Sequence, residues 1–166
     1  QRDLALISLV SNKVKIYYNP YTLDTSKPKR ITQFAKQLGL YVIWNENNDT
    51  VTFTAANWAD YSTKVVADAA MANSIGVDEF LVGNEMSIHN DNSADFDDTN
   101  LPAKVKQLVT DCDANFPGTK GVEEGWWKKD AWNNVGLGSL DKIHFTLYEN
   151  LDGFKSAAQD IFNKFG

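Results

Sequence analysis

The 166-residue sequence predicts an α/β fold in which parallel strands alternate with helices. Helical and strand patterns alternate along the whole chain, and parallel strands need such long crossover connections. The strand segments are almost continuously apolar, which is typical of strands buried on both faces. Polar residues follow the carboxyl end of each strand, where α/β barrels keep their active sites. Two architectures fit this pattern: an open doubly wound sheet, or part of a (β/α)8 TIM-type barrel.

The first half of the chain predicts two helix-to-strand units. Residues 4–12, LALISLVSN, have the apolar spacing of a helix, and residues 13–20, KVKIYYNP, are rich in the β-branched and aromatic residues that favour strands. Residues 26–39, SKPKRITQFAKQLG, have Pro28 in the first turn and a glycine at the end, which is typical of a helix. The strand LYVIWNEN, residues 40–47, follows at once.

The second half continues the alternation. Apolar residues at helical spacing predict three more helices, and short apolar runs bounded by Gly, Pro or Asp predict three more strands. The segment WWKKDAWNNVGLGSL is expected to be irregular or weakly helical. The predicted helices are residues 57–76, 100–116 and 152–165, and the predicted strands are residues 78–85, 120–125 and 141–150.

The composition indicates one globular domain over residues 1–166, because 43% of the residues are hydrophobic and no low-complexity linker interrupts the pattern. Nucleic acid is not an expected partner, since 16 Lys and Arg residues face 22 Asp and Glu residues and the formal net charge is -6. A membrane is not expected either, because no apolar run approaches the roughly 20 residues that span a bilayer.

Phosphate-binding motifs are missing from the sequence. A doubly wound nucleotide-binding sheet is expected to carry G-x-G-x-x-G after a strand or G-x-x-x-x-G-K-[ST], and neither occurs. The glycines at Gly136 and Gly138 precede a predicted strand, which is the wrong place for that role. The barrel is therefore the favoured architecture.

The stretch FLVGNE ends an apolar strand with Asn84 and Glu85. This arrangement resembles the retaining glycoside hydrolases built on the α/β barrel, the group of cellulases, mannanases and galactanases, in which strand four ends in Asn-Glu. The resemblance implies that Glu85 is the general acid/base and that Asn84 binds the sugar hydroxyl next to the anomeric carbon. It also implies hydrolysis of β-glycosidic bonds in a poly- or oligosaccharide by double displacement.

The same resemblance sets the register of the other strands. If residues 78–85 form strand four, the chain runs from helix 1 to helix 6 of the barrel. The nucleophilic Glu of these hydrolases ends strand seven, so it is expected beyond Gly166, with Glu149 as a weaker alternative. The Arg and His that cellulase-like members carry on strands two and three have no counterpart in this sequence.

Aromatic and amide residues near the predicted strand ends are candidates for sugar binding, because pyranose faces pack on indoles while their hydroxyls bond to amides. We expect Glu85 to share one cleft with most of them. Trp132 is a further candidate, for which core packing is as plausible. The predicted substrate-binding residues are Asn19, Trp44, Asn45, Asn84, Trp126, Trp127 and Tyr148.

Other features predict structural roles. The single cysteine, Cys112, is expected to be a buried inert thiol, and His144 a satisfied interior histidine. The acidic loop HNDNSADFDDTN fails the EF-hand template, so neither a metal nor a cofactor is expected. Asn48 opens an Asn-Asp-Thr glycosylation triplet of the kind that often arises by chance.

Two rival functions remain open from the sequence. The first is a non-catalytic carbohydrate-binding barrel, and the second is an open α/β protein that binds a nucleotide or small metabolite. Secretion is expected only from the substrate class, since polymeric glycans lie outside most cells; the amino-terminal QRDLALISLV has no signal-peptide pattern.

Overall fold

The computed structural model describes residues 2–21, 24–48, 50–91, 93–146 and 151–165. Helices and strands alternate along these residues, with three short 3₁₀ turns in the loops. The strands are β1 (Lys13–Tyr18), β2 (Tyr41–Glu46), β3 (Glu79–Asn84), β4 (Thr119–Gly125) and β5 (Lys142–Thr146). The helices are α1 (Arg2–Ile7), α2 (Ser26–Gln37), α3 (Trp58–Ser74), α4 (Asn100–Asp111), α5 (Lys129–Val135) and α6 (Leu151–Phe165), and the 3₁₀ turns are η1 (Met86–Ile88), η2 (Ala94–Phe96) and η3 (Trp126–Lys128).

The five strands form one parallel sheet in the order β1-β2-β3-β4-β5. Each strand therefore lies beside the next one in the chain, and the order never reverses. A doubly wound sheet needs such a reversal, with helices on both of its faces. The sequential order is that of an α/β barrel, which confirms the predicted barrel class and rules out the open doubly wound alternative.

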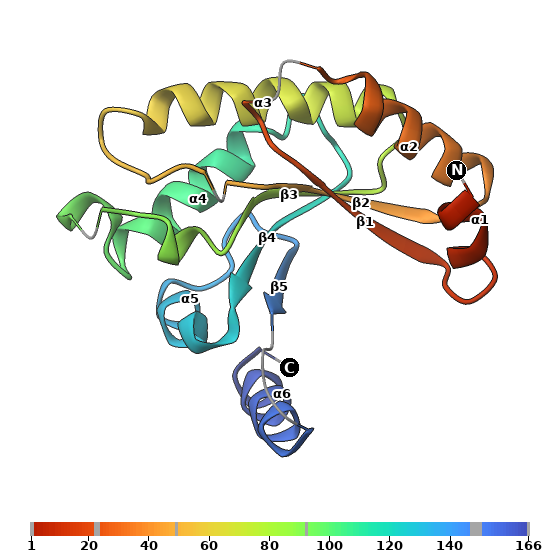
Figure 1. Cartoon of the computed structure of the whole chain (residues 1–166). Coiled ribbons are helices and arrows are strands. Elements are labelled where there is room, and N and C mark those ends of the chain that lie inside the picture. The colour runs from red at the N-terminus through yellow and green to blue at the C-terminus, as the bar shows by residue number, and fades with distance from the viewer. Residues whose placement is uncertain (1, 22–23, 49, 92, 147–150, 166) are drawn as a thin grey trace.

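Helices α2, α3 and α4 cover one face of the sheet (Figure 1). The core lies between them and alternate strand residues, including Ile16, Trp44, Phe80 and Val122, which are all buried. Tyr61 of α3 bonds to the strand directly, because its hydroxyl donates to the Val82 carbonyl at 2.8 Å. Burial of these side chains is the main force that fixes the helices on this face.

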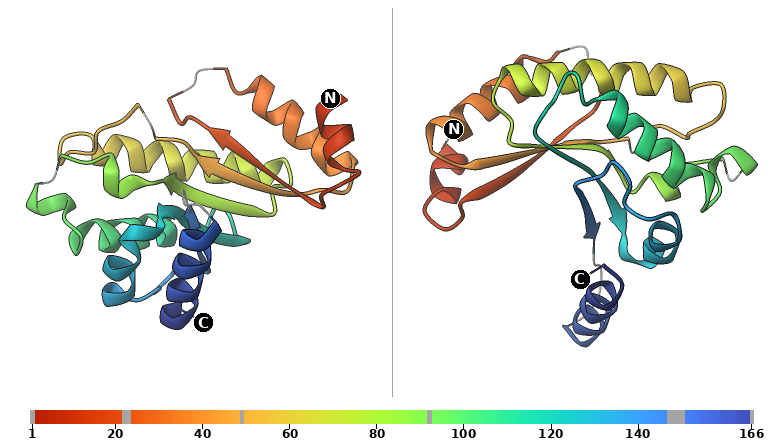
Figure 2. Two further views of the ribbon diagram at one scale, coloured as in Figure 1. Left: turned by 60° about the horizontal axis from the view of Figure 1, so that its bottom comes forward. Right: turned by 180° about the vertical axis from the view of Figure 1, so that it is seen from behind.

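The opposite face of the sheet is concave and polar. Lys15 and Tyr17 of β1 reach Glu123 of β4, with Nζ 2.8 Å and the phenol oxygen 3.2 Å from its carboxylate. In a flat sheet, strands three places apart would be separated by about 14 Å, since neighbours lie roughly 4.8 Å apart. The sheet must therefore curl strongly toward this face, as in the wall of a barrel; the views of Figure 2 show the curl from two further sides.

Local details differ from the sequence prediction at a few places. The first helix ends at Ile7 instead of continuing to residue 12. The segment predicted to be irregular or weakly helical contains the short helix α5, in agreement with the second of these alternatives. Cys112 is buried and unpaired, as expected, and burial raises the pKa of its thiol to about 12. Among the described residues, no helix is both long and apolar enough to cross a membrane.

Candidate active site

Glu85 follows the last residue of β3, at the carboxyl edge of the sheet. Its side chain is largely shielded, with 8% of the residue exposed. Its backbone is left-handed (φ 47°), and it is the one non-glycine residue with a positive φ in the described part of the chain. Its N–H donates to the Glu123 carbonyl at 2.8 Å, which extends the pairing of β3 with β4 by one residue. The sheet thus carries this carboxylate on a rigid edge.

Asn84, the residue before Glu85, is held from the loop that follows β2. Its backbone N–H donates to the side-chain oxygen of Asn48 at 2.8 Å, and Asn48 is fully buried. Asn48 is the first residue of the glycosylation triplet. Because its side chain is buried and bonded inside the protein, it is not an accessible glycan acceptor and instead fixes the end of β3.

Glu124 lies next to the turn that follows Glu85. Its carboxylate accepts hydrogen bonds from the hydroxyl of Ser87 at 2.8 Å, the N–H of Ser87 at 3.2 Å and the N–H of Gly125 at 3.1 Å. Burial raises the pKa of Glu124 to about 7 although these hydrogen bonds oppose the change, and the negative charge of Glu85 adds to the rise. The two carboxyl groups are therefore electrostatically linked.

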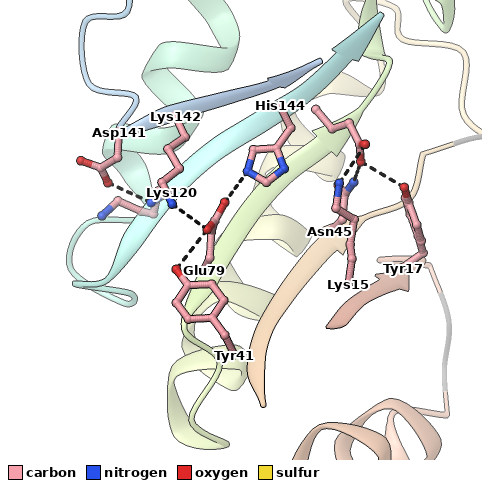
Figure 3. Close-up of polar contacts among 10 residues, drawn as sticks. Lys15, Tyr17, Tyr41, Asn45, Glu79, Lys120, Asp141, Lys142 and His144 are labelled. Atoms are coloured by element: carbon pink, nitrogen blue, oxygen red, sulfur yellow. Dashed lines mark hydrogen bonds and ion pairs between the residues drawn. The ribbon is translucent and has the colours of Figure 1, made fainter. Parts of the chain in front are cut away.

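Glu123 is the centre of a polar network on the concave face. Its carboxylate accepts hydrogen bonds from Lys15, Tyr17 and the amide of Asn45 (Figure 3). It also accepts one from the hydroxyl of Thr146 at 3.2 Å. These donors come from β1, β2 and β5, so one carboxylate cross-links three strands to β4. The network stabilises the curvature that brings the strand ends together.

A second network lies near the amino ends of the strands. Glu79 accepts from Tyr41 and Lys142, each at 3.0 Å, and its other oxygen is 2.5 Å from Nε2 of His144 (Figure 3). Burial by itself would raise the pKa of Glu79, but the hydrogen bonds from His144, Lys142 and Tyr41 outweigh it and lower that pKa to about 2. His144 is therefore a partly buried histidine whose Nε2 is paired with Glu79, which fits a structural role.

The structure separates the predicted sugar-binding residues into groups. Asn19 follows β1 at the same edge of the sheet as Asn84 and Glu85, and its side chain accepts the N–H of Tyr21 at 2.8 Å. Trp126 and Trp127 follow β4 at this edge; Trp127 is 42% exposed, and the ammonium of Lys129 lies 4.7 Å from the Trp126 ring centre. Their convergence with Glu85 on one cleft stays a prediction. Tyr148 and Glu149 lie outside the described residues.

Three of the candidates are buried. Trp44 is completely buried on the helix face and packs edge-on against Tyr18 at 5.1 Å, so the prediction that it binds substrate is wrong. Asn45, on the opposite face of the same strand, is also fully buried and binds Glu123 instead of facing solvent. Trp132 is 1% exposed and belongs to the core.

Glu46 is the last residue of β2, and its side chain points toward the helices. Its neighbour Asn45 faces the concave side, and successive strand residues point to opposite faces. Glu46 is fully buried, and neither carboxylate oxygen has a hydrogen-bond partner within the described residues. Burial, and then the charge of Asp68, raises the pKa of Glu46 well above its ordinary value.

A polar hollow of about 440 Å³ opens beside the turn after Glu85. The acidic loop forms much of its wall, anchored by the buried ring of Phe96, and Asp98 is paired with Lys128 across it at 2.7 Å. Within the described ranges, no group of three or more His, Cys, Asp or Glu side chains could hold a metal ion. The hollow is lined by Ser87, Asn90, Phe96, Asp97, Asp98, Thr99 and Lys128.

The sequence did not reveal that Asn48, Glu123 and Glu124 support this edge. The consecutive glutamates on β4 offered one usable signal, since strand alternation places one of them on each face of the sheet. The partners of these residues come from distant strands and could not be predicted locally.

The fold and the acidic strand ends together define part of an α/β barrel with its polar residues at the carboxyl edge. No protein-family model and no curated protein matches the sequence. Solved structures of glycoside hydrolases share the fold. A GH113 β-1,4-mannanase matches 98% of this chain with a TM-score of 0.75 and 16% sequence identity.

A second neighbour is a GH113 β-mannanase from Alicyclobacillus acidocaldarius in complex with ManMIm, which matches 97% of this chain with a TM-score of 0.70 and 13% sequence identity. A structure of fungal β-1,4-galactanases matches 96% of this chain with a TM-score of 0.59 and 14% sequence identity. The chain spans about 60% of the length of these structures. At such identities the likeness shows the fold.

Proposed function

We propose that this chain is the larger part of a retaining glycoside hydrolase that acts on β-linked glycans, with Glu85 as the general acid/base. A glycosidic oxygen is a poor leaving group until it is protonated, and a partly desolvated carboxyl group can hold the required proton near neutral pH. The observation that carries the proposal is a shielded carboxylate, Glu85, directly after β3 at the carboxyl edge of a barrel-type sheet.

The substrate class is a β-linked poly- or oligosaccharide. Neighbours with this fold are mannanases and galactanases by name, so β-mannan and β-galactan are the first substrates to test. The exposed indole of Trp127 offers an apolar platform for a sugar ring, and Asn84 at the strand end offers polar groups for a hydroxyl. Asn19 and Trp126 complete the proposed binding surface.

The retaining mechanism requires a second carboxylate about 5 to 5.5 Å from the first. It is expected on the seventh strand of the barrel, with Glu149 as the alternative in the present chain. The proposal therefore includes the expectation that this chain alone has little or no turnover, whereas a longer chain with two further strand–helix units is active.

The test is hydrolysis of β-mannan, β-galactan and β-glucan by the two chains, with proton NMR of the first-formed product to read its anomeric configuration. The proposal expects turnover by the longer chain with retention, and loss of turnover in Glu85→Gln. Asp111→Asn is the matched control, because it removes an exposed carboxylate on α4, far along the chain from Glu85. Inversion of configuration, or full activity in Glu85→Gln, would contradict the proposal.

A non-catalytic carbohydrate-binding barrel is the other outcome of the same experiment. It would bind mannan or galactan oligosaccharides in titration calorimetry while the longer chain shows no turnover on any of the three polymers. Stabilisation by nucleotides with no response to oligosaccharides would contradict both readings.

A further inference from the structure

The backbone at Glu85 needs outside support. A left-handed conformation costs a non-glycine residue roughly 1–2 kcal/mol, so the surrounding structure must hold it in place. The chain then enters η1, in which the Ile88 N–H donates to the Glu85 carbonyl at 3.1 Å. A turn of three residues cannot fix its own orientation relative to the sheet.

The neighbouring strand β4 provides the support at two successive residues. Glu123 uses its backbone carbonyl to accept the N–H of Glu85, and Glu124 uses its side chain to accept both the N–H and the hydroxyl of Ser87. The strained residue is thus fixed on one side by the sheet ladder and on the other side by a buried carboxylate.

We infer that Glu124 is a positioning residue for Glu85: its carboxylate clamps Ser87 and so keeps Glu85 in the one backbone conformation that presents its side chain at the carboxyl edge of the sheet. The positioning stands on geometry alone, whereas its value for catalysis rests on the proposed function of Glu85.

The chemistry of the clamp requires a carboxylate. The N–H and the hydroxyl of Ser87 and the N–H of Gly125 all donate to Glu124, so both of its carboxylate oxygens act as acceptors. A glutamine of the same shape would turn an NH₂ group toward one of these donors, leaving two donors face to face in a fully buried place. Burial is the main cause of the raised pKa of Glu124, and the negative charge of Glu85 adds to it.

The test compares three variants by amide hydrogen exchange, with the rates at residues 85 and 87 divided by those of central β3 amides. Glu124→Gln should speed exchange at Ser87 by about 10-fold to 100-fold, the loss expected for a hydrogen bond to a charged group. Ser87→Ala deletes only the hydroxyl and should give a smaller increase. Asp111→Asn is the control: it makes the same change from carboxylate to amide at an exposed residue of α4, so the normalised rates should not change.

A crystal structure of Glu124→Gln should show that φ of Glu85 has left the positive region or that Ser87 has moved away from β4. Unchanged exchange at residues 85 and 87 together with an unchanged φ would overturn the inference. If Glu124→Gln does not fold, Ser87→Ala decides, and normal protection at residue 87 in that variant would overturn the inference.

Kinetics of the longer chain separate this inference from the proposed function. Glu124→Gln should lower kcat with little change in KM, and more strongly for substrates with poor leaving groups. Faster amide exchange in Glu124→Gln, together with an activity loss in Glu85→Gln that does not depend on the leaving group, would uphold the positioning and refute the acid/base role. A leaving-group effect in Glu85→Gln, together with unchanged amide exchange in Glu124→Gln, would uphold the acid/base role and refute the positioning.

Discussion

The buried Glu79 cluster predicts a stability that depends on pH. In the folded chain His144, Lys142 and Tyr41 hold the pKa of Glu79 at about 2, below its ordinary 4.5. A difference of about 2.5 pH units corresponds to about 3 kcal/mol at about 1.4 kcal/mol per unit. Because Lys142 is half-exposed and screened by solvent, we expect about 1–2 kcal/mol to be realised.

The sign follows from the lowered pKa. The stabilisation is fully present above about pH 4.5, where the unfolded chain is also ionised, and it is lost as the pH falls through about 2. Glu79→Gln keeps the shape of the side chain and removes the charge. It should therefore lower the free energy of unfolding by about 1–2 kcal/mol at neutral pH, and the gap to the wild type should narrow steadily toward low pH.

The assay is urea unfolding followed by tryptophan fluorescence and circular dichroism at several pH values between about 7 and about 3. Asp95→Asn, which removes an exposed carboxylate, is the control and should show no such pH-dependent gap. Equal stability of Glu79→Gln and the wild type at neutral pH, or a gap that does not change with pH, would refute the reasoning.

Three further predictions concern single side chains. Burial, followed by the charge of Asp68, raises the pKa of Glu46. The contribution of Glu46 to stability is therefore present below about pH 4.5 and is lost as the pH rises toward the pKa of the folded chain. The melting temperature of Glu46→Gln should exceed that of the wild type by an amount that grows between about pH 5 and about pH 9. Trp127→Ala should weaken oligosaccharide binding about tenfold in calorimetry with little effect on stability. Trp132→Ala should cost about 3–5 kcal/mol of unfolding free energy. The opposite pattern would assign the core role to Trp127 and the binding role to Trp132. Asn48→Ala should cost about 1–3 kcal/mol of unfolding free energy, because it removes the buried oxygen that accepts the Asn84 N–H. The intact mass of the wild-type chain from a glycosylating host should show no glycan at Asn48, and a glycan there would contradict its burial.

The sequence was sufficient for the fold because its signals are local. Apolar runs, glycine stops and helical spacing place each strand to within a few residues, and strict alternation leads to a parallel sheet. The Asn84–Glu85 pair was also found locally, since a polar pair that ends an apolar strand stands out in the sequence.

The orientation of side chains on β2 could not be predicted in the same way. The run LYVIW is apolar at every position, so it has no two-residue period from which to tell the faces apart. Trp44 is predicted at the carboxyl edge from its position along the strand, but its side chain faces the helices, as does that of Glu46. The polar residues Lys15 and Tyr17 on β1 were the available hint that odd-numbered positions face the concave side there.

The networks around Glu123 and Glu79 depend on curvature, which is not a local property. Lys15 and Glu123 are 108 positions apart and meet only because the sheet curls. The pattern of the sequence shows that the residues of these networks are polar, but it does not show which of them bond to one another.

The central claim, that Glu85 is the general acid/base, is tested most directly by the leaving-group dependence of Glu85→Gln in the longer chain. The variant and the wild type are compared on β-mannan or β-galactan oligosaccharides, which need protonation of the leaving oxygen, and on activated aryl glycosides of the same sugar, which do not. The account predicts a loss of at least about 100-fold on the oligosaccharides and a much smaller loss on the aryl glycosides. An equal loss on both kinds of substrate would remove the acid/base role from Glu85.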